Sequence, residues 1–346
     1  MPTMPSWQEL PQILRAPGIS IKWIGSDDEV WHLSGWNEGA EGAFLSGPVK
    51  GILGVPFKSI WHEPAYGAPR FERIVDERRE VSLRIAICSD TEFGWANADS
   101  RFWRGMSGDK AGYLSVFTRS TGELWIPMLL AESVQNDLTE DPRYSASDNV
   151  MEYDVLLAAD GEPRWRAPDL RPPEWVNAFA APDYLKPIRS IKIKQDETKK
   201  AREITVGVGQ FKVANRGDVP AWPVYTVTAP GRCWLPDGVS GRMVRVPPLA
   251  KGEHIIVDTN PEHRIAISSL DPVDSWTKQV LRNSELLSWL FGQYGESGVS
   301  VLERFHGQGF TQPIAPGEVA TLPVYHDTKN ARVSVRLPQR YDRVIS

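Results

Sequence analysis

Val81-Ser82-Leu83-Arg84-Ile85-Ala86-Ile87 is the part of this sequence with the plainest structural pattern. Large branched apolar residues occupy every second position, and the intervening positions hold Ser82, Arg84 and Ala86. Side chains of a β-strand point alternately to its two faces, so this spacing predicts a strand with one face in a core. The segments around it have the same character, and together they decide the fold class.

Most other apolar segments are also short, and turn clusters separate them. Gly and Pro number 28 each, which favours many short strands over a helical bundle. We predict a hairpin from 112–117 and 123–130, with a turn through Arg119, Ser120 and Thr121-Gly122. The other strands are predicted at 19–23, 30–32, 81–87, 150–158, 188–194, 203–213, 222–228, 241–246, 254–258, 264–268 and 331–337. Apolar residues change parity within 203–213, and we expect a β-bulge near Gly209 to cause the change.

Two segments have the period of a helix instead. The first runs from Glu92 to Met106, with Asp90 or Thr91 as the expected N-cap. The second starts at Asp271, which precedes a proline at the first helical position, and carries an apolar stripe over 276–294. The fold class is therefore predicted as mainly β, with one helix in each half of the chain.

The length of 346 residues predicts two domains, because one core rarely supports so long a chain. Prolines are dense and periodicity is weak between 167 and 187. We therefore predict an N-terminal domain at 1–170, a Pro-rich linker at 171–187 and a C-terminal domain at 188–346.

Composition narrows the class of function. A net charge of −5 and a pI near 5.8 argue against a nucleic-acid binder, which needs a basic face, but not against a protein that surrounds passing DNA. Two cysteines cannot form a disulfide framework or a four-cysteine zinc site. Neither a signal-peptide core nor an apolar run of about 20 residues is found. We expect synthesis in the cytosol and no insertion into a membrane.

The sequence contains no residue pattern that we assign to catalysis, cofactor binding or metal binding. His254, Asp258 and His263 come closest to a metal-ligand set, but their spacing fits no standard motif, and turn or surface roles are favoured. Acid pairs such as Asp27-Asp28 could suggest a glycosidase, yet its two carboxylates must face each other across a cleft. We interpret the pairs as solvated turns, and the mixed charges at 73–80 as a solvated face or as ion pairing between subunits.

Tryptophan is unusually frequent, with 14 residues. About half would fill the cores of two domains, and the others suit contacts with neighbouring subunits, where Trp contributes strongly to binding. Trp31 and Trp36, beside a Gly-rich stretch, and Trp175, in the Pro-rich segment, are the predicted interface residues.

Several turn motifs occur in a characteristic succession. They are 160–166 (DGEPRWR), 215–223 (NRGDVPAWP) followed by VYTVT and APG, 257–264 (VDTNPEHR) and 305–317 (FHGQGFTQPIAPG). Their order and spacing resemble the minor tail proteins of siphophages, especially those of actinobacteria, and among them the distal tail protein family. The segment at 271–300 resembles a helical insertion relative to shorter relatives.

This resemblance implies a fold and a role. It implies an N-terminal ring-forming β-sandwich with one helix and an extended hairpin, and a C-terminal sandwich of jelly-roll or galectin-like type. It implies a non-enzymatic structural component of the virion, without cofactors, assembled in the host cytoplasm and located at the tail tip. Such a protein forms a homo-oligomeric ring, commonly of six copies, that joins the tail tube to the tip or baseplate and lets DNA pass. The implied partners are further copies of the chain, the tail tube protein, the tape measure protein and other tail-tip proteins.

Two alternatives from other classes stay open. A carbohydrate-binding tail-tip module would use exposed Trp on the second domain to bind a host cell-surface glycan. A cell-wall glycosidase would depend on one acid pair for turnover.

Overall fold

The computed structural model divides into two compact units, unit 1 (Met1–Ala167 and Tyr341–Ser346) and unit 2 (Pro168–Arg340). It describes residues 18–64, 66–134, 150–167, 175–178, 189–193, 202–228, 230–249, 252–263, 266–269, 299–300, 305, 307–329 and 331–345. The predicted linker at 171–187 and helix from Asp271 lie largely or wholly outside these residues and stay predictions. The predicted fold class is confirmed: the chain is mainly β, and its sheets form sandwich-like arrangements.

Unit 1 is built on one antiparallel sheet with the strand order β2-β1-β7-β8-β9-β6-β3. The ends of this path, β2 and β3, lie against each other, so the sheet curls around a single core. Short strand β10 pairs with β8 and with β22. The strands are β1 (Ile19–Ile24), β2 (Val30–Ser34), β3 (Ala43–Leu45), β6 (Glu80–Cys88), β7 (Gly112–Thr118), β8 (Gly122–Leu130), β9 (Val150–Ala159), β10 (Trp165–Arg166) and β22 (Arg340–Tyr341).

Strand β6 confirms the pattern that decided the fold class. Val81, Leu83, Ile85 and Ile87 are all 0% exposed and form part of the core of unit 1. Pairing of β6 with β9 over nine residues and with β3 on its other side places it inside the sheet. The predicted hairpin is also confirmed, as β7 and β8.

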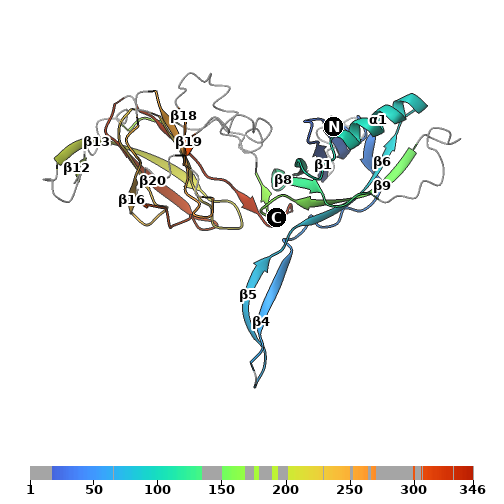
Figure 1. Cartoon of the computed structure of the whole chain (residues 1–346), viewed down its shortest axis with the longest axis horizontal. Helices are drawn as coiled ribbons and strands as arrows, with labels where there is room; N and C mark the ends of the chain where they lie inside the picture. The colour runs from blue at the N-terminus through green and yellow to red at the C-terminus, as the bar shows by residue number, and fades with distance from the viewer. Residues whose placement is uncertain are drawn as a thin grey trace, which may run out of the picture. The chain divides into compact units, whose positions relative to one another are not determined.

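Helix α1 (Glu92–Arg104) lies beside β6 (Figure 1); it begins as predicted and ends two residues before the predicted Met106. The side chain of Thr91 accepts a hydrogen bond from the backbone N–H of Gly94, which satisfies one unpaired donor of the first turn. Gly105 ends the helix. The buried side of α1 carries Trp95 and Phe102 into the core of unit 1.

The last residues of the chain return to unit 1, whereas the sequence predicts all of 188–346 as the second domain. Val344 is 0% exposed and packs in the core of unit 1. The hydroxyl of Thr121 donates a hydrogen bond to the carbonyl oxygen of Val344, at 2.8 Å. Unit 2 is therefore an insertion in the chain of unit 1, a feature that no local pattern in the sequence indicates.

Unit 2 consists of two antiparallel sheets around a second core. One sheet has the order β11-β21-β14-β17-β18-β19 and the other β12-β13-β20-β15-β16. Its strands are β11 (Trp175–Val176), β12 (Arg189–Ile193), β13 (Arg202–Ala214), β14 (Val224–Thr228), β15 (Cys233–Pro236), β16 (Met243–Arg245), β17 (His254–Asp258), β18 (Ala266–Ser269), β19 (Val299–Ser300), β20 (Val319–His326) and β21 (Val333–Arg336). Its assignment to the jelly-roll or galectin-like type stays a prediction.

The predicted bulge near Gly209 is wrong. Strand β13 pairs with β20 in an unbroken register from Gly207 to Ala214, and the residues before Gly207 pair with β12 instead. In the part of β13 that pairs with β20, the odd-numbered positions, such as Phe211, point into the core. Gly207 and Gly209 also occupy odd-numbered positions but have no apolar side chain. The alternation of apolar and polar residues is therefore hidden in the sequence. A Cβ at Gly209 would lie 2.6 Å from a methyl carbon of Val176, so close packing explains the glycine.

His326 makes the stability of unit 2 sensitive to acid. Its side chain is 1% exposed, and burial lowers its pKa to about 4 despite the opposing charge of Asp327. As the pH falls, the unfolded chain binds this proton first, so unit 2 loses stability through the window from about 6.5 to 4. We expect a loss of about 2 kcal/mol between pH 7.5 and pH 5 in urea unfolding. His326→Asn should show a smaller loss, and equal losses in both proteins would contradict this account.

Candidate assembly surface

A two-stranded sheet of unit 1, formed by β4 (Phe57–His62) and β5 (Arg70–Asp76), stands apart from the main sheet. It extends away from that sheet as a hairpin (Figure 1). Every residue of β5 is exposed, and none of β4 is buried. The hairpin thus has the hydrogen bonds of a sheet without a core of its own.

The register of the hairpin gives it two chemically different faces. Cross-strand partners point to the same side of a sheet. The pairs Phe57↔Asp76, Ser59↔Ile74 and Trp61↔Phe71 therefore lie on one side, and Lys58↔Val75, Ile60↔Arg73 and His62↔Arg70 on the other. We call Phe57, Trp61, Phe71 and Ile74 the apolar face, and Lys58, Arg70 and Arg73 the basic face.

A register shift between Ile60 and Trp61 creates the apolar face. Simple alternation along β5 would place Phe71 on the side opposite Ile74. The shift turns Phe71 toward Trp61, and the two rings meet edge to face with centroids 5.7 Å apart. The irregularity therefore gathers aromatic side chains on one side of the hairpin.

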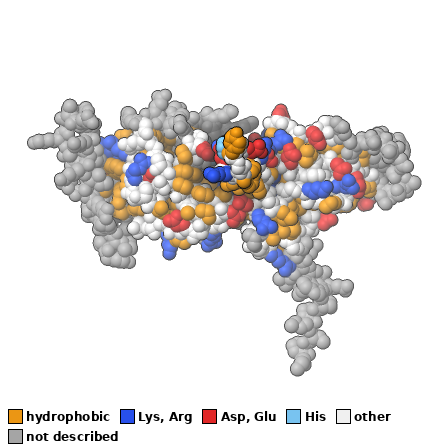
Figure 2. Space-filling view, turned by 90° about the horizontal axis from the view of Figure 1, so that it is seen from below, with side chains coloured by type: hydrophobic (Ala, Val, Ile, Leu, Met, Phe, Trp, Pro, Cys, Tyr) orange, Lys and Arg blue, Asp and Glu red, His pale blue; other side chains and the backbone are white. Residues whose placement is uncertain are grey.

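The apolar face is open to water in the single chain. Phe57, Trp61, Phe71 and Ile74 are 57%, 55%, 53% and 54% exposed. Since an aromatic side chain covers about 150–250 Å² when buried, these half-exposed groups present roughly 300–500 Å², comparable to the largest apolar patch of a typical monomer. In Figure 2 the hairpin points toward the viewer, and hydrophobic and basic side chains lie beside each other on it. A two-stranded hairpin is only marginally stable alone in water, so this one is suited to packing against a partner.

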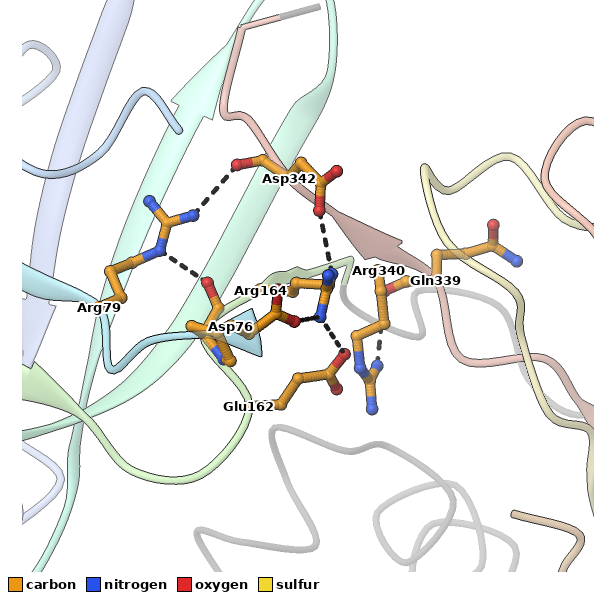
Figure 3. Close-up of polar contacts among 8 residues, drawn as sticks. Asp76, Arg79, Glu162, Arg164, Gln339, Arg340 and Asp342 are labelled. Carbon is orange, nitrogen blue, oxygen red and sulfur yellow. Dashed lines mark hydrogen bonds and ion pairs between the residues drawn. The ribbon is translucent and has the colours of Figure 1, made fainter. Parts of the chain in front are cut away.

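Ion pairs and hydrogen bonds hold the base of the hairpin (Figure 3). Arg164 contacts Asp76 at 2.5 Å, Asp342 at 3.0 Å and Glu162 at 3.7 Å. Burial alone would lower the pKa of Arg164, but the hydrogen bond to Asp76 and the surrounding carboxylates raise it. The end of β5 is thereby tied to the loop after β9 and to the C-terminal segment.

Arg79, three residues beyond the hairpin, is a buried junction between distant segments. Its side chain is 0% exposed and donates hydrogen bonds to three carbonyl oxygens, those of Pro163, Gly51 and Asp342, at 2.7, 2.7 and 3.1 Å. Its guanidinium lies 5.4 Å from the ring centroid of Trp165. Burial lowers the pKa of Arg79 to about 10, with Arg164 adding to the effect and Asp342 opposing it.

One of these features corrects the sequence interpretation. Within the mixed charges at 73–80, Arg73 and Arg78 are exposed as predicted for a solvated face, but Arg79 lies in the interior. Gly51 belongs to the same junction: its φ is +89°, and a Cβ would lie 1.9 Å from the carbonyl oxygen of Glu80. Only glycine fits there, because both the backbone conformation and the space exclude a side chain.

The predicted interface tryptophans lie in three different environments. Trp31 is 0% exposed and packs edge to face on Phe102, so in this conformation it offers no surface to a neighbour. Trp36 is partly buried and stacks on Phe117, with ring centroids 5.2 Å apart. Trp175 is partly exposed in β11. An interface role for Trp36 and Trp175 stays a prediction.

The residues of the exposed hairpin were missed by sequence reasoning. A signal was present, because two runs of strand-forming residues flank the turn-forming stretch 64–69 (PAYGAP). The alternation of apolar and polar residues is nevertheless weak in these runs. Ile60 lies on the basic side, and the register shift moves Phe71 to the side of Trp61.

Other polar clusters have structural roles in the described residues. Nδ1 of His263 lies 2.8 Å from Oδ2 of Asp258. The other carboxylate oxygen of Asp258 accepts a hydrogen bond from the backbone N–H of Asn260. Both contacts fit the predicted turn role.

The described residues contain no group of three His, Cys, Asp or Glu side chains arranged to hold a metal. Burial raises the pKa of the thiols of Cys88 and Cys233, which disfavours their reactive thiolate forms.

The open alternative of glycan binding needs exposed aromatic side chains on unit 2, where Trp175 and Trp222 are partly exposed among the described residues. Its large exposed apolar residues there are Val239 and Val319, and neither is aromatic. Trp276 and Trp289, in the predicted insertion, lie outside the described residues. No described helix is long and apolar enough to cross a membrane.

Comparisons with known proteins give matches among solved structures only. No protein-family model matches the chain, and no curated protein sequence matches it. The SPP1 Dit (gp 19.1) protein, described as a paradigm of the hub adsorption apparatus in phages that infect Gram-positive bacteria, is 10% identical over 93% of this chain and 98% of its own, with a TM-score of 0.49. Chains of the phage P2 baseplate in its activated conformation, with Ca and with Sr, are 10% and 9% identical over 94% of this chain and 99% of theirs, each with a TM-score of 0.49. These three structures are described as phage hub and baseplate proteins.

Proposed function

We propose that the chain is a non-enzymatic structural component of a siphophage tail, which forms a ring at the distal end of the tail tube. The ring would join the tube to the tip or baseplate, with the tail tube and tape measure proteins as neighbours, and would let DNA pass. Six copies are the expected number from the resemblance of the sequence motifs. This role needs no catalytic group.

The observation that carries this proposal is the exposed hairpin of unit 1. A closed ring requires a heterologous interface, in which one patch of a subunit binds a different patch of the next. A projecting hairpin with an open apolar face is suited to that geometry, because it can reach a neighbour while its base stays fixed by Asp76 and Arg164. The apolar face then becomes the core of the contact between copies.

Replacing Trp61 and Phe71 by serine should abolish assembly without unfolding the chain. Interface aromatics contribute most of the binding energy, so the affinity between copies should fall at least about 100-fold. The measurement is the mass in solution by light scattering over a concentration series. Phe93→Ser with Val319→Ser is the matched control, since it removes exposed apolar side chains outside the hairpin, which are 84% and 56% exposed. An assembled mass in the Trp61/Phe71 variant would refute the role of the hairpin.

A further inference from the structure

Among the described residues, no ion pair involves the cations of the basic face of the hairpin. Lys58, Arg70 and Arg73 lie on the same side of β4 and β5 and are exposed. The ion pairs at the base of the hairpin join Arg164 to Asp76, Glu162 and Asp342 and do not include these three cations. Cations that neighbour one another across strands repel, so a partner that supplies negative charge would stabilise this arrangement.

The rest of unit 1 carries the opposite charge. Outside the hairpin, residues 18–56, 77–134, 150–167 and 341–346 contain 12 Lys and Arg against 18 Asp and Glu, a net charge of −6. The hairpin extends away from the main sheet of its own unit (Figure 1), which favours contact with the acidic surface of another copy. Charge complementarity between the basic face and the acidic body thus favours association of one copy with the next.

Nucleic acid is the other polymer that cations bind. Residues 57–76 contain three Lys and Arg and three Asp and Glu, so the hairpin has no net positive charge. Glu63 and Glu72 place negative charge among these cations, which weakens attraction to a uniformly anionic polymer such as DNA. A folded protein surface, on which both signs of charge occur, is the better match.

We propose that the basic face of the hairpin docks on an acidic surface of unit 1 in the next copy, while the apolar face packs against that same copy. This inference rests on the proposed ring. It adds that Lys58, Arg70 and Arg73 determine the orientation in which the hairpin binds, and that salt weakens the assembly. Electrostatic contacts at the rim of an apolar interface contribute mainly to orientation and rate of association, and they are screened by salt.

The test is charge reversal at the basic face in the full-length chain. Lys58→Glu, Arg70→Glu and Arg73→Glu together should weaken association between copies about 100-fold at 50 mM salt, measured by light scattering. Lys212→Glu, Arg216→Glu and Arg332→Glu make the same charge change at exposed positions of unit 2 and should leave the mass unchanged. Unfolding temperatures of both variants are compared with the wild type, so that loss of assembly is not confused with loss of fold.

The outcomes separate this inference from the proposed function. If the wild-type chain and the Lys58/Arg70/Arg73 charge-reversal variant assemble equally well, the basic face does not contact the neighbouring copy. The inference is then wrong, but the proposed ring is not contradicted. The inference is also wrong if the charge-reversal variant assembles like the wild type but binds less well to a duplex DNA column, because the basic face would then bind DNA. If wild-type chain forms no assembly at 50 mM salt, alone or with tail tube protein, the proposed function itself fails.

Discussion

Arg79→Met is expected to destabilise unit 1 by about 3–5 kcal/mol, as measured by urea unfolding of the full-length chain. Arg79 is fully buried and donates three hydrogen bonds to carbonyl oxygens of segments that are far apart in sequence. Hydrogen bonds from a charged donor contribute about 1.5–3 kcal/mol each. Methionine fills much of the volume but leaves the three carbonyl groups without this donor.

The neighbouring residue provides the control. Arg78 is an exposed side chain that pairs with Glu80, and such surface pairs contribute little. Arg78→Met should therefore change the stability by less than about 0.5 kcal/mol. Equal effects of the two substitutions would contradict the assignment of Arg79 as a buried junction. Unit 2 should unfold at the same urea concentration in all three proteins.

Removal of Tyr341–Ser346 is expected to destabilise the N-terminal unit by more than about 4 kcal/mol and to leave unit 2 folded. The deletion removes Val344 from the core of unit 1. It also removes Asp342, whose carbonyl oxygen accepts from Arg79 and whose carboxylate accepts from Arg164. The free energy of unfolding of a folded domain is about 5–15 kcal/mol, so unit 1 should lose a large part of its stability.

Two point variants separate the buried contribution from the effect of shortening the chain. Val344 is 0% exposed and Ile345 is 43% exposed. Val344→Ser should lower the stability of unit 1 by about 2–3 kcal/mol, and Ile345→Ser by less than about 0.5 kcal/mol. Calorimetry resolves the transitions of the two units. A deletion that shifts only the transition of unit 2 would contradict the return of the C-terminus to unit 1.

Much of the fold could be predicted because its strands have one buried and one open face. Strand β6 shows this directly, since burial follows the alternation of Val81, Leu83, Ile85 and Ile87. The start of α1 could be predicted because a threonine cap is a local signal. The buried Arg79 could not be predicted, because its partners come from sequence positions 28, 84 and 263 residues away.

The candidate assembly surface could be predicted only in part. Abundant Trp indicated interfaces, but tryptophans are also core residues, and Trp31 proved to be one of these. The hairpin lacks a buried face, so the usual alternation of apolar and polar residues is not imposed on it. Register, which no residue pattern here specifies, decides that Phe71 joins Trp61 and that Arg70 and Arg73 join Lys58.

Electron microscopy of the purified wild-type chain, alone and mixed with the tail tube protein, tests the proposed ring most directly. The account predicts closed rings with a central channel, wide enough for duplex DNA, at low salt. It also predicts that the Trp61/Phe71 serine variant gives single particles of one chain under the same conditions. Wild-type chain that stays monomeric in both samples would contradict the proposal that unit 1 assembles through its hairpin.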